Sequence, residues 1–100
     1  MNEKYSTELY RQEGTNSRFV RLTVKPDGSV FMETQDMGEQ VERIWGDSDY
    51  EFWIDVPAGA LTKLVFALLR DRYAGQAGAV DEFRDFCKRE QIDHKWDSWV

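Results

Sequence analysis

Apolar and polar residues alternate over several short stretches in the first half of the chain. The alternation is clearest over residues 18–25, and it is weaker over residues 5–12 and 30–35. Such alternation is typical of a strand that buries one face. Between residues 18–25 and 30–35, Pro26-Asp27-Gly28-Ser29 fits a hairpin turn, because proline presets φ and glycine accepts a positive φ. The pattern therefore predicts three strands in succession.

Residues 36–46 fit two patterns. Asp36 and Glu39 have the spacing of a helical capping box, and a helix would place three apolar residues on one face: Val41, Ile44 and Trp45. Alternatively, the segment alternates as a strand and is followed by a turn over 46–49. We favour a short helix here.

The next stretch, residues 50–56, has the most regular strand pattern of the chain. Its two sides are apolar (Tyr50, Phe52, Ile54 and Val56) and mixed acidic and aromatic (Glu51, Trp53 and Asp55). Apolar residues then recur at intervals of three and four over 59–74 and 78–91, which predicts two helices. The β-branched and aromatic content of residues 92–99 predicts a last strand.

The expected order of elements is therefore β-β-β-(short α)-β-α-α-β. Runs of strands followed by helices indicate an α+β fold. We expect an antiparallel sheet of about four to five strands with the two C-terminal helices packed on one face. One hundred residues suffice for one domain, spanning 1–100.

Composition and charge narrow the possible functions. The hydrophobic content of 41% is too high for a disordered chain, and a net charge of −6 argues against nucleic acid as the partner. The longest apolar run, residues 64–69, is too short to span a membrane. A single cysteine, Cys87, permits no internal disulfide, which favours the reducing cytoplasm.

The negative charge is concentrated in one segment. Residues 31–57 contain eight acidic residues against one basic residue. Within this segment, three large aromatic side chains alternate with acids, and the expected partner-binding residues are Trp45, Asp47, Asp49, Glu51, Trp53 and Asp55. An exposed tryptophan flanked by carboxylates suits a basic protein, because the ring supplies contact area and the acids steer the encounter.

The sequence thus favours a small acidic protein-interaction module without enzymatic activity, such as an inhibitor or immunity-like protein. A second explanation of the same pattern is structural: the aromatic rings would form a small second core, or the acids would protect a sheet edge from aggregation. The turn over Asp47–Glu51 lacks the glycine and the distal glutamate of a calcium loop, so we expect no metal. The sequence also has no glycine-rich phosphate loop, and we expect no cofactor.

An alternative function is binding or conversion of a small molecule. The pocket would then lie between sheet and helices and be lined by Arg72, His94 and Trp96. Arg72 falls within the apolar arc of its helix, where a long side chain can also direct its charged end to solvent. We expect no catalytic pairing of Cys87 with His94, because this cysteine lies on an apolar helical stripe.

Overall fold

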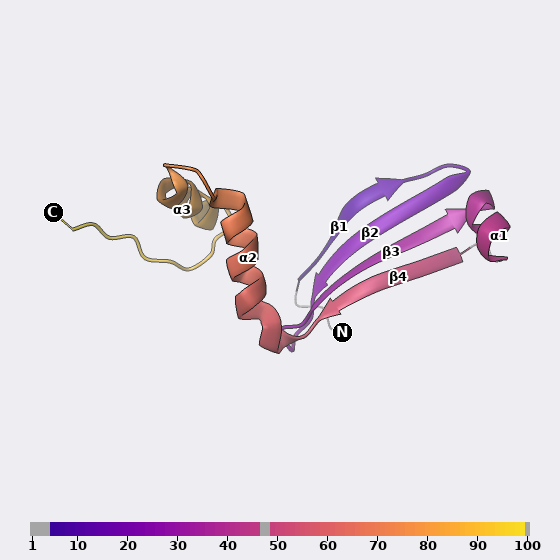
Figure 1. Cartoon of the computed structure of the whole chain (residues 1–100), viewed down its shortest axis with the longest axis horizontal. Coiled ribbons are helices and arrows are strands. Elements are labelled where there is room, and N and C mark those ends of the chain that lie inside the picture. The colour runs from indigo at the N-terminus through magenta and orange to yellow at the C-terminus, as the bar shows by residue number, and fades with distance from the viewer. Residues whose placement is uncertain (1–4, 47–48, 100) are drawn as a thin grey trace. The chain divides into compact units, whose positions relative to one another are not determined.

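Four antiparallel strands and two longer helices make up the computed structural model, which describes residues 5–46 and 49–99 (Figure 1). The elements are β1 (Tyr5–Gln12), β2 (Asn16–Val24), β3 (Val30–Gly38), α1 (Glu39–Trp45), β4 (Asp49–Val56), the 3-10 turn η1 (Ala58–Ala60), α2 (Leu61–Tyr73) and α3 (Ala79–Arg89). The predicted α+β class is confirmed, as is the order of elements up to the second long helix.

The chain divides into two compact units, residues 1–64 and 65–100. The first unit contains the sheet and α1, and the second contains α3 and most of α2. The organisation of 1–100 as a single domain stays a prediction, and so does the packing of the two helices on one face of the sheet. In the described parts of the chain, no helix is long and apolar enough to cross a membrane.

The predicted hairpin turn joins β2 to β3. Gly28, with a φ of +90°, donates its N–H to the Lys25 carbonyl over 2.9 Å, and the Lys25 N–H donates to the Ser29 carbonyl over 2.9 Å. The Asp27 carboxylate accepts from both the hydroxyl and the N–H of Ser29, at 2.7 and 2.9 Å. These hydrogen bonds lower the pKa of Asp27. The turn thereby fixes which residues of β2 and β3 lie opposite each other.

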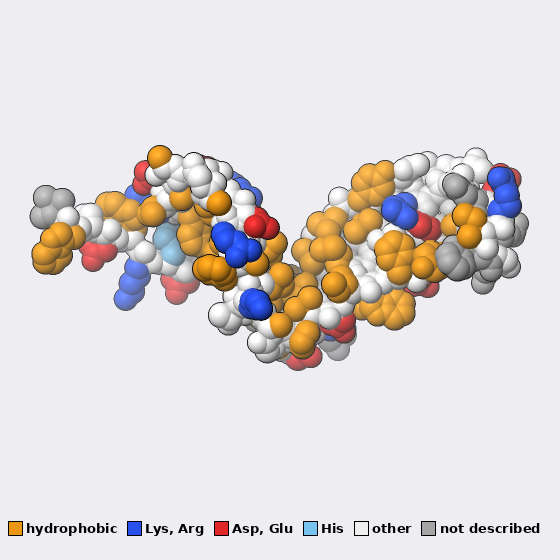
Figure 2. Space-filling model, in the orientation of Figure 1, with side chains coloured by type: hydrophobic (Ala, Val, Ile, Leu, Met, Phe, Trp, Pro, Cys, Tyr) orange, Lys and Arg blue, Asp and Glu red, His pale blue; other side chains and the backbone are white. Residues whose placement is uncertain are grey.

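The strands pair in the order β1-β2-β3-β4, and their register gives the sheet two different faces. The apolar face carries Tyr5, Tyr10, Val20, Leu22, Val24, Val30, Met32, Phe52, Ile54 and Val56. The opposite face carries Glu8, Arg11, Phe19, Arg21, Phe31, Glu33, Glu51, Trp53 and Asp55. The space-filling view shows apolar side chains gathered over the sheet (Figure 2).

The transition from β3 to α1 differs from the predicted capping box. The strand continues through Asp36 to Gly38, and the helix begins at Glu39. Asp36 is paired across the sheet with Arg18 and caps no helix, so the predicted capping box is wrong. The helical alternative for this segment is nevertheless confirmed. Val41, whose residue exposure is only 8%, anchors α1, which contacts β2, β3 and β4.

The second unit is built around the contact between α2 and α3. The rings of Tyr73 and Phe83 lie with their centroids 5.7 Å apart, and Cys87 is 5% exposed. Gly75, with a φ of +79°, follows the end of α2 and provides the left-handed conformation common after a helix. The two helices predicted over 59–74 and 78–91 thus form over Leu61–Tyr73 and Ala79–Arg89.

The predicted last strand is wrong: residues 92–99 contain no strand. The chain leaves α3 through Gln91, with a φ of +58°, and the Ile92 N–H donates to the Cys87 carbonyl over 2.8 Å. Strands need a neighbouring strand for their backbone hydrogen bonds, and the described part of this unit has none. Ile92 is also the only β-branched residue in 92–99, so local preference for a strand is weak.

Gly38 is expected to be essential for the junction between β3 and α1. Its φ is +126°, and a Cβ atom at this position would collide with the Thr15 carbonyl oxygen. Gly14 has a similar φ of +144°, but its surroundings are open within 4 Å. Gly38→Ala should therefore lower the free energy of unfolding by about 2 kcal/mol more than Gly14→Ala, the cost of overpacking. Urea denaturation of both variants measures this difference, and equal losses would contradict the junction described here.

Candidate functional site

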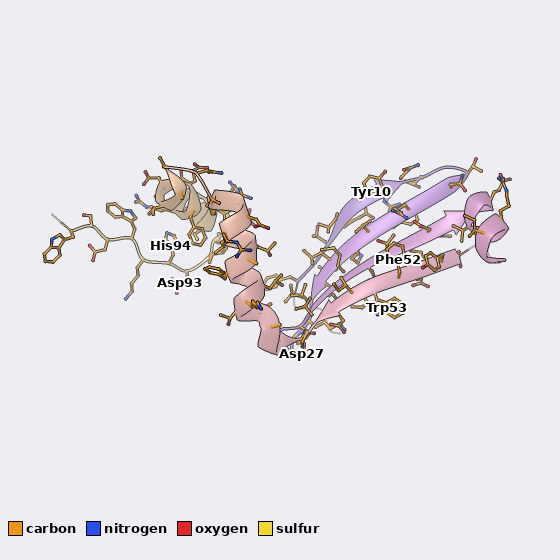
Figure 3. All side chains as sticks on the ribbon, in the orientation of Figure 1. Tyr10, Asp27, Phe52, Trp53, Asp93 and His94 are labelled. Carbon is orange, nitrogen blue, oxygen red and sulfur yellow. The ribbon has the colours of Figure 1, made fainter. Side chains whose placement is uncertain are left out.

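Strand β4 presents its acidic and aromatic side chains on the face opposite its apolar ones. Side chains alternate along a strand, so four exposed residues share that face: Asp49, Glu51, Trp53 and Asp55. These four residues are called the acidic strip. Figure 3 shows Phe52 and Trp53 on opposite sides of the strand. The sequence pattern predicts Glu51, Trp53 and Asp55 on one side of a strand, and the structure has the same alternation. Asp49 precedes the predicted strand and is the first residue of β4 in the structure.

Trp53 forms the centre of the acidic strip and is held by neighbours. The residue is 62% exposed, yet its ring centroid lies 6.3 Å from that of Phe31 on β3. Glu33 is its direct cross-strand partner. Aromatic pairs of this kind contribute about 0.5–1.5 kcal/mol beyond their buried area. The indole is therefore accessible to a partner and has an aromatic contact within the sheet.

The strip is negatively charged because it contains three carboxylates, and within the described residues one ion pair involves them. The Lys25 ammonium lies 4.0 Å from Asp55 and 4.7 Å from the centre of the Phe31 ring. Exposed pairs of this kind contribute little stability. Among the residues that the structure describes, Asp49 and Glu51 form no ion pair. Their uncompensated charge therefore attracts cations from the solvent.

Two further residues predicted for this surface are not placed. Asp47 lies outside the described residues, and the side chain of Trp45 does too. The candidate interaction surface therefore consists of the four residues of the acidic strip.

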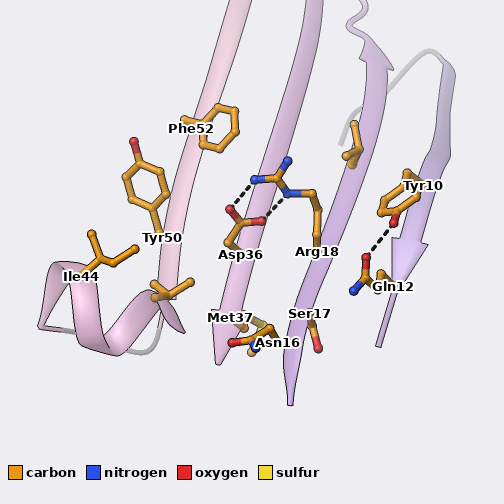
Figure 4. Close-up of a pocket in the computed structure, with 12 residues that line it drawn as sticks. Tyr10, Gln12, Asn16, Ser17, Arg18, Asp36, Met37, Ile44, Tyr50 and Phe52 are labelled. Atoms are coloured by element: carbon orange, nitrogen blue, oxygen red, sulfur yellow. Dashed lines mark hydrogen bonds and ion pairs between the residues drawn. The ribbon is translucent and has the colours of Figure 1, made fainter. Parts of the chain in front are cut away.

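A cavity of about 680 Å³ lies on the apolar face, with α1 on one side (Figure 4). It is lined by Tyr10, Gln12, Asn16, Ser17, Arg18, Val20, Asp36, Met37, Val41, Ile44, Tyr50 and Phe52. Sequence reasoning missed this cavity. One signal was present: Arg18 and Asp36 interrupt the apolar side of two strands, in phase with Val20 and Met32.

An ion pair forms part of the polar lining of this cavity, which also includes Gln12, Asn16 and Ser17. The Arg18 guanidinium donates through Nε and Nη2 to the two carboxylate oxygens of Asp36, over 2.6 Å each. It also lies 5.8 Å from the centre of the Phe52 ring. The hydrogen bonds from Arg18, together with its charge, hold the pKa of Asp36 below its usual value, and those same hydrogen bonds raise the pKa of Arg18. The pair leaves the cavity without net charge from these two groups.

The residues proposed for the alternative pocket have separate neighbours within the second unit. The Arg72 guanidinium lies 5.1 Å from the centre of the Phe86 ring. His94 is exposed, with Nδ1 at 2.8 Å from the Ile92 carbonyl oxygen. Trp96 is half-exposed, and the Arg84 guanidinium lies over its ring, 4.5 Å from the ring centre of Trp96. A pocket formed by Arg72, His94 and Trp96 stays a prediction.

Neither a metal-binding cluster nor a known relative identifies the function of the site. Within residues 5–46 and 49–99, no three His, Cys, Asp or Glu side chains gather as a metal site would require. No protein-family model, curated protein or solved structure matches the chain.

The ion pair predicts a pH dependence of stability. The pKa of Asp36 is lower in the folded state than its unfolded value of about 3.9. Its contribution is therefore present above that value and is lost as the pH falls through the folded pKa. Asp36→Asn should cost about 1 kcal/mol at pH 7, since half-exposed Arg18 is partly screened. The Tm of the variant should also fall less steeply than that of the unsubstituted protein between pH 5 and 2.

Asp49→Asn is the matched control, because its carboxylate is exposed and forms no ion pair within the described residues. Calorimetric scans over this pH range should show a parallel acid-induced loss of Tm for this control and the unsubstituted protein. A parallel loss for Asp36→Asn as well would mean that the ion pair does not contribute.

Proposed function

We propose that this protein is a non-enzymatic interaction module that binds a basic protein through the acidic strip. The observation that carries the proposal is the exposure of Trp53 among three exposed carboxylates on one face of one strand. Tryptophan is enriched among the residues that contribute most to protein interfaces. Carboxylates around it raise the rate at which a cationic partner arrives.

A purely structural role, in solubility or edge protection, accounts for the acids of the strip but not for its exposed tryptophan. Acidic residues anywhere on the surface would provide solubility, and charged residues at an edge would suffice against aggregation. Neither purpose requires a large indole. A small second core would account for the contact of Trp53 with Phe31, but it would not leave the indole 62% exposed. A binding surface accounts for both the exposed ring and the acids around it.

A module of this kind suits inhibition of a basic enzyme, as in an inhibitor or immunity-like protein. The acids would approach the positively charged site of the enzyme, and Trp53 would exclude water from the contact. The proposal also places the protein in the cytoplasm. There the single thiol, Cys87, would stay reduced.

The proposal predicts that a basic probe binds the acidic strip in preference to other acids of the chain. The probe is a flexible peptide of alternating lysine and glycine, titrated at low ionic strength. The triple substitution Asp49→Asn, Glu51→Gln and Asp55→Asn should weaken binding about tenfold, a loss of about 1.4 kcal/mol shared by three charges. Raising the salt to about 0.5 M should have a similar effect, because the Debye length shrinks to about 4 Å.

The matched control removes the same number of charges elsewhere, through Asp71→Asn, Asp85→Asn and Asp93→Asn, all of which are exposed. This control should change the affinity by less than about twofold. Equal effects of the two triple variants would contradict the proposal, because they would show that only the net charge matters. NMR chemical-shift mapping with the unsubstituted protein should identify Glu51 and Trp53 among the most perturbed residues.

A second candidate function is the binding of a small uncharged molecule in the cavity of the apolar face. The specific observation in its favour is the mutually compensated pair of Arg18 and Asp36 beside aromatic rings, within about 680 Å³. Volumes of 300–1,000 Å³ are typical of small-molecule sites. Because the two charges compensate each other, an uncharged ligand with a planar aromatic group fits this cavity best.

This second function predicts a hit from a screen of uncharged aromatic fragments by NMR. The ligand should perturb residues that line the cavity, and Phe52→Ala should weaken its binding about tenfold through the loss of ring contact. Trp53→Ala is the control, since its side chain lies on the opposite face of the same strand. A ligand equally sensitive to both substitutions would not be bound in the cavity.

A further inference from the structure

The two edges of the sheet differ in how they are protected. Strand β1 contains an irregularity between Glu8 and Tyr10, where its register with β2 shifts. Strand β4 pairs with β3 in unbroken register from Asp49 to Val56 and contains no proline, glycine or lysine. Bulges, prolines and lysines are the usual features that keep an edge strand from pairing with another chain. Strand β4 lacks all three, and its protection against pairing is the negative charge of Asp49, Glu51 and Asp55, which does not repel a basic strand.

Within the first unit, the outer edge of β4 has no neighbouring strand in the described residues. It is the last strand of the sheet, and on an edge strand every second residue directs its N–H and C=O away from its only neighbour. The turn and loop hydrogen bonds of the described chain involve no backbone group of residues 49–56. Eight residues of extended strand thus present a row of donors and acceptors about 27 Å long.

The side chains on the two sides of this edge differ in chemistry. On one side lies the acidic strip. On the other side lie Phe52 and Ile54, which are 42% and 62% exposed. A strand added beside β4 would place its own alternate side chains about 4.5–5.5 Å from these residues. The edge therefore selects a strand that is basic on one side and apolar on the other.

We propose that the basic partner binds by adding an extended segment to the outer edge of β4, with basic and apolar residues in alternation. This inference rests on the proposed function, to which it adds the mode of binding and the sequence pattern of the bound segment. Main-chain hydrogen bonds supply affinity in this mode of recognition, and alternate side chains supply specificity. The basic side chains lie beside Asp49, Glu51 and Asp55, and the apolar ones beside Phe52 and Ile54.

Charge argues against a second copy of the chain at this edge. If two β4 strands paired with each other, the acidic side chains of both copies would gather on a shared face or face the apolar side of the partner. Like charges placed opposite each other destabilise a sheet. The same acids stabilise a basic segment. The acidic strip thus disfavours pairing between identical chains and leaves the edge available to a basic one.

The test uses four peptides of eight residues, each with four lysines and four valines. One alternates the two residue types, one has the lysines and valines in separate blocks, and two are the alternating peptide N-methylated either on all lysines or on all valines. An edge strand directs only every second N–H toward its neighbour. Methylation of one set should therefore abolish backbone pairing, whereas methylation of the other set should be tolerated.

The alternating peptide should bind at least tenfold more tightly than the block peptide, as measured by calorimetry. One methylated peptide should lose at least tenfold in affinity and the other less than threefold. Which of the two loses affinity reports a parallel or an antiparallel orientation. Ile54→Lys, at a position 62% exposed, should weaken the alternating peptide at least fivefold and leave the block peptide unchanged or weaker by less than twofold.

Equal affinities for the alternating, block and methylated peptides, together with sensitivity to the triple substitution in the acidic strip, would overturn strand addition and leave the proposed function intact. If the triple substitution changed the affinity of none of the four peptides, both strand addition and the proposed function would be overturned. Association of the unliganded chain into dimers, with new amide protection along β4 in hydrogen exchange, would also overturn the inference, because the edge would then belong to a second copy.

Discussion

The antiparallel pairing of β3 with β4 is the constraint on which the candidate surface depends. Its register runs without interruption from Val30 opposite Val56 to Met37 opposite Asp49. Because side chains alternate, a slip of one residue would move every acid of β4 to the apolar face and every apolar residue to the other. Trp53 adds to the constraint through its contact with the Phe31 ring. A single pairing thus separates the charged surface from the apolar one.

The apolar face is also organised by a polar contact. Arg18 and Asp36 are cross-strand partners in β2 and β3, and their two hydrogen bonds satisfy both charges within a largely apolar region. Removing one member leaves the other without its hydrogen bonds, at a cost of about 1 kcal/mol because Arg18 is half-exposed and partly screened. The pair therefore favours the same register of β2 against β3 that the hairpin turn at Gly28 favours.

Much of the fold could be predicted from local sequence. The alternation in β2 and β4, the turn after Pro26 and the periodicity of the two long helices are patterns that neighbouring residues determine. Asp36 shows where this reasoning ends. Its spacing from Glu39 indicated a helix cap, but a partner 18 residues earlier, Arg18, holds it in a strand. Local patterns carry no information about such a distant partner.

The acidic strip was predictable in part for the same reason. Alternation sufficed to place Glu51, Trp53 and Asp55 on one side of a strand. The support from Phe31 and the proximity of Lys25 depend on pairing between strands, which the sequence alone does not specify. The error over residues 92–99 has a related origin, because aromatic residues favour a strand only where another strand is available to pair with them. The cavity depends on four strands and a helix, so its residues could not have been grouped by spacing.

The burial of Cys87 has a practical consequence for the study of motion in this protein. It is the only thiol of the chain, and it is 5% exposed on α3. A thiol reagent can reach it only while its surroundings are open, so the rate of modification measures how often this part of the chain opens. The molecule thus carries a natural chemical reporter of local unfolding, at a position remote in sequence from the acidic strip, and no cysteine has to be introduced or removed to use it.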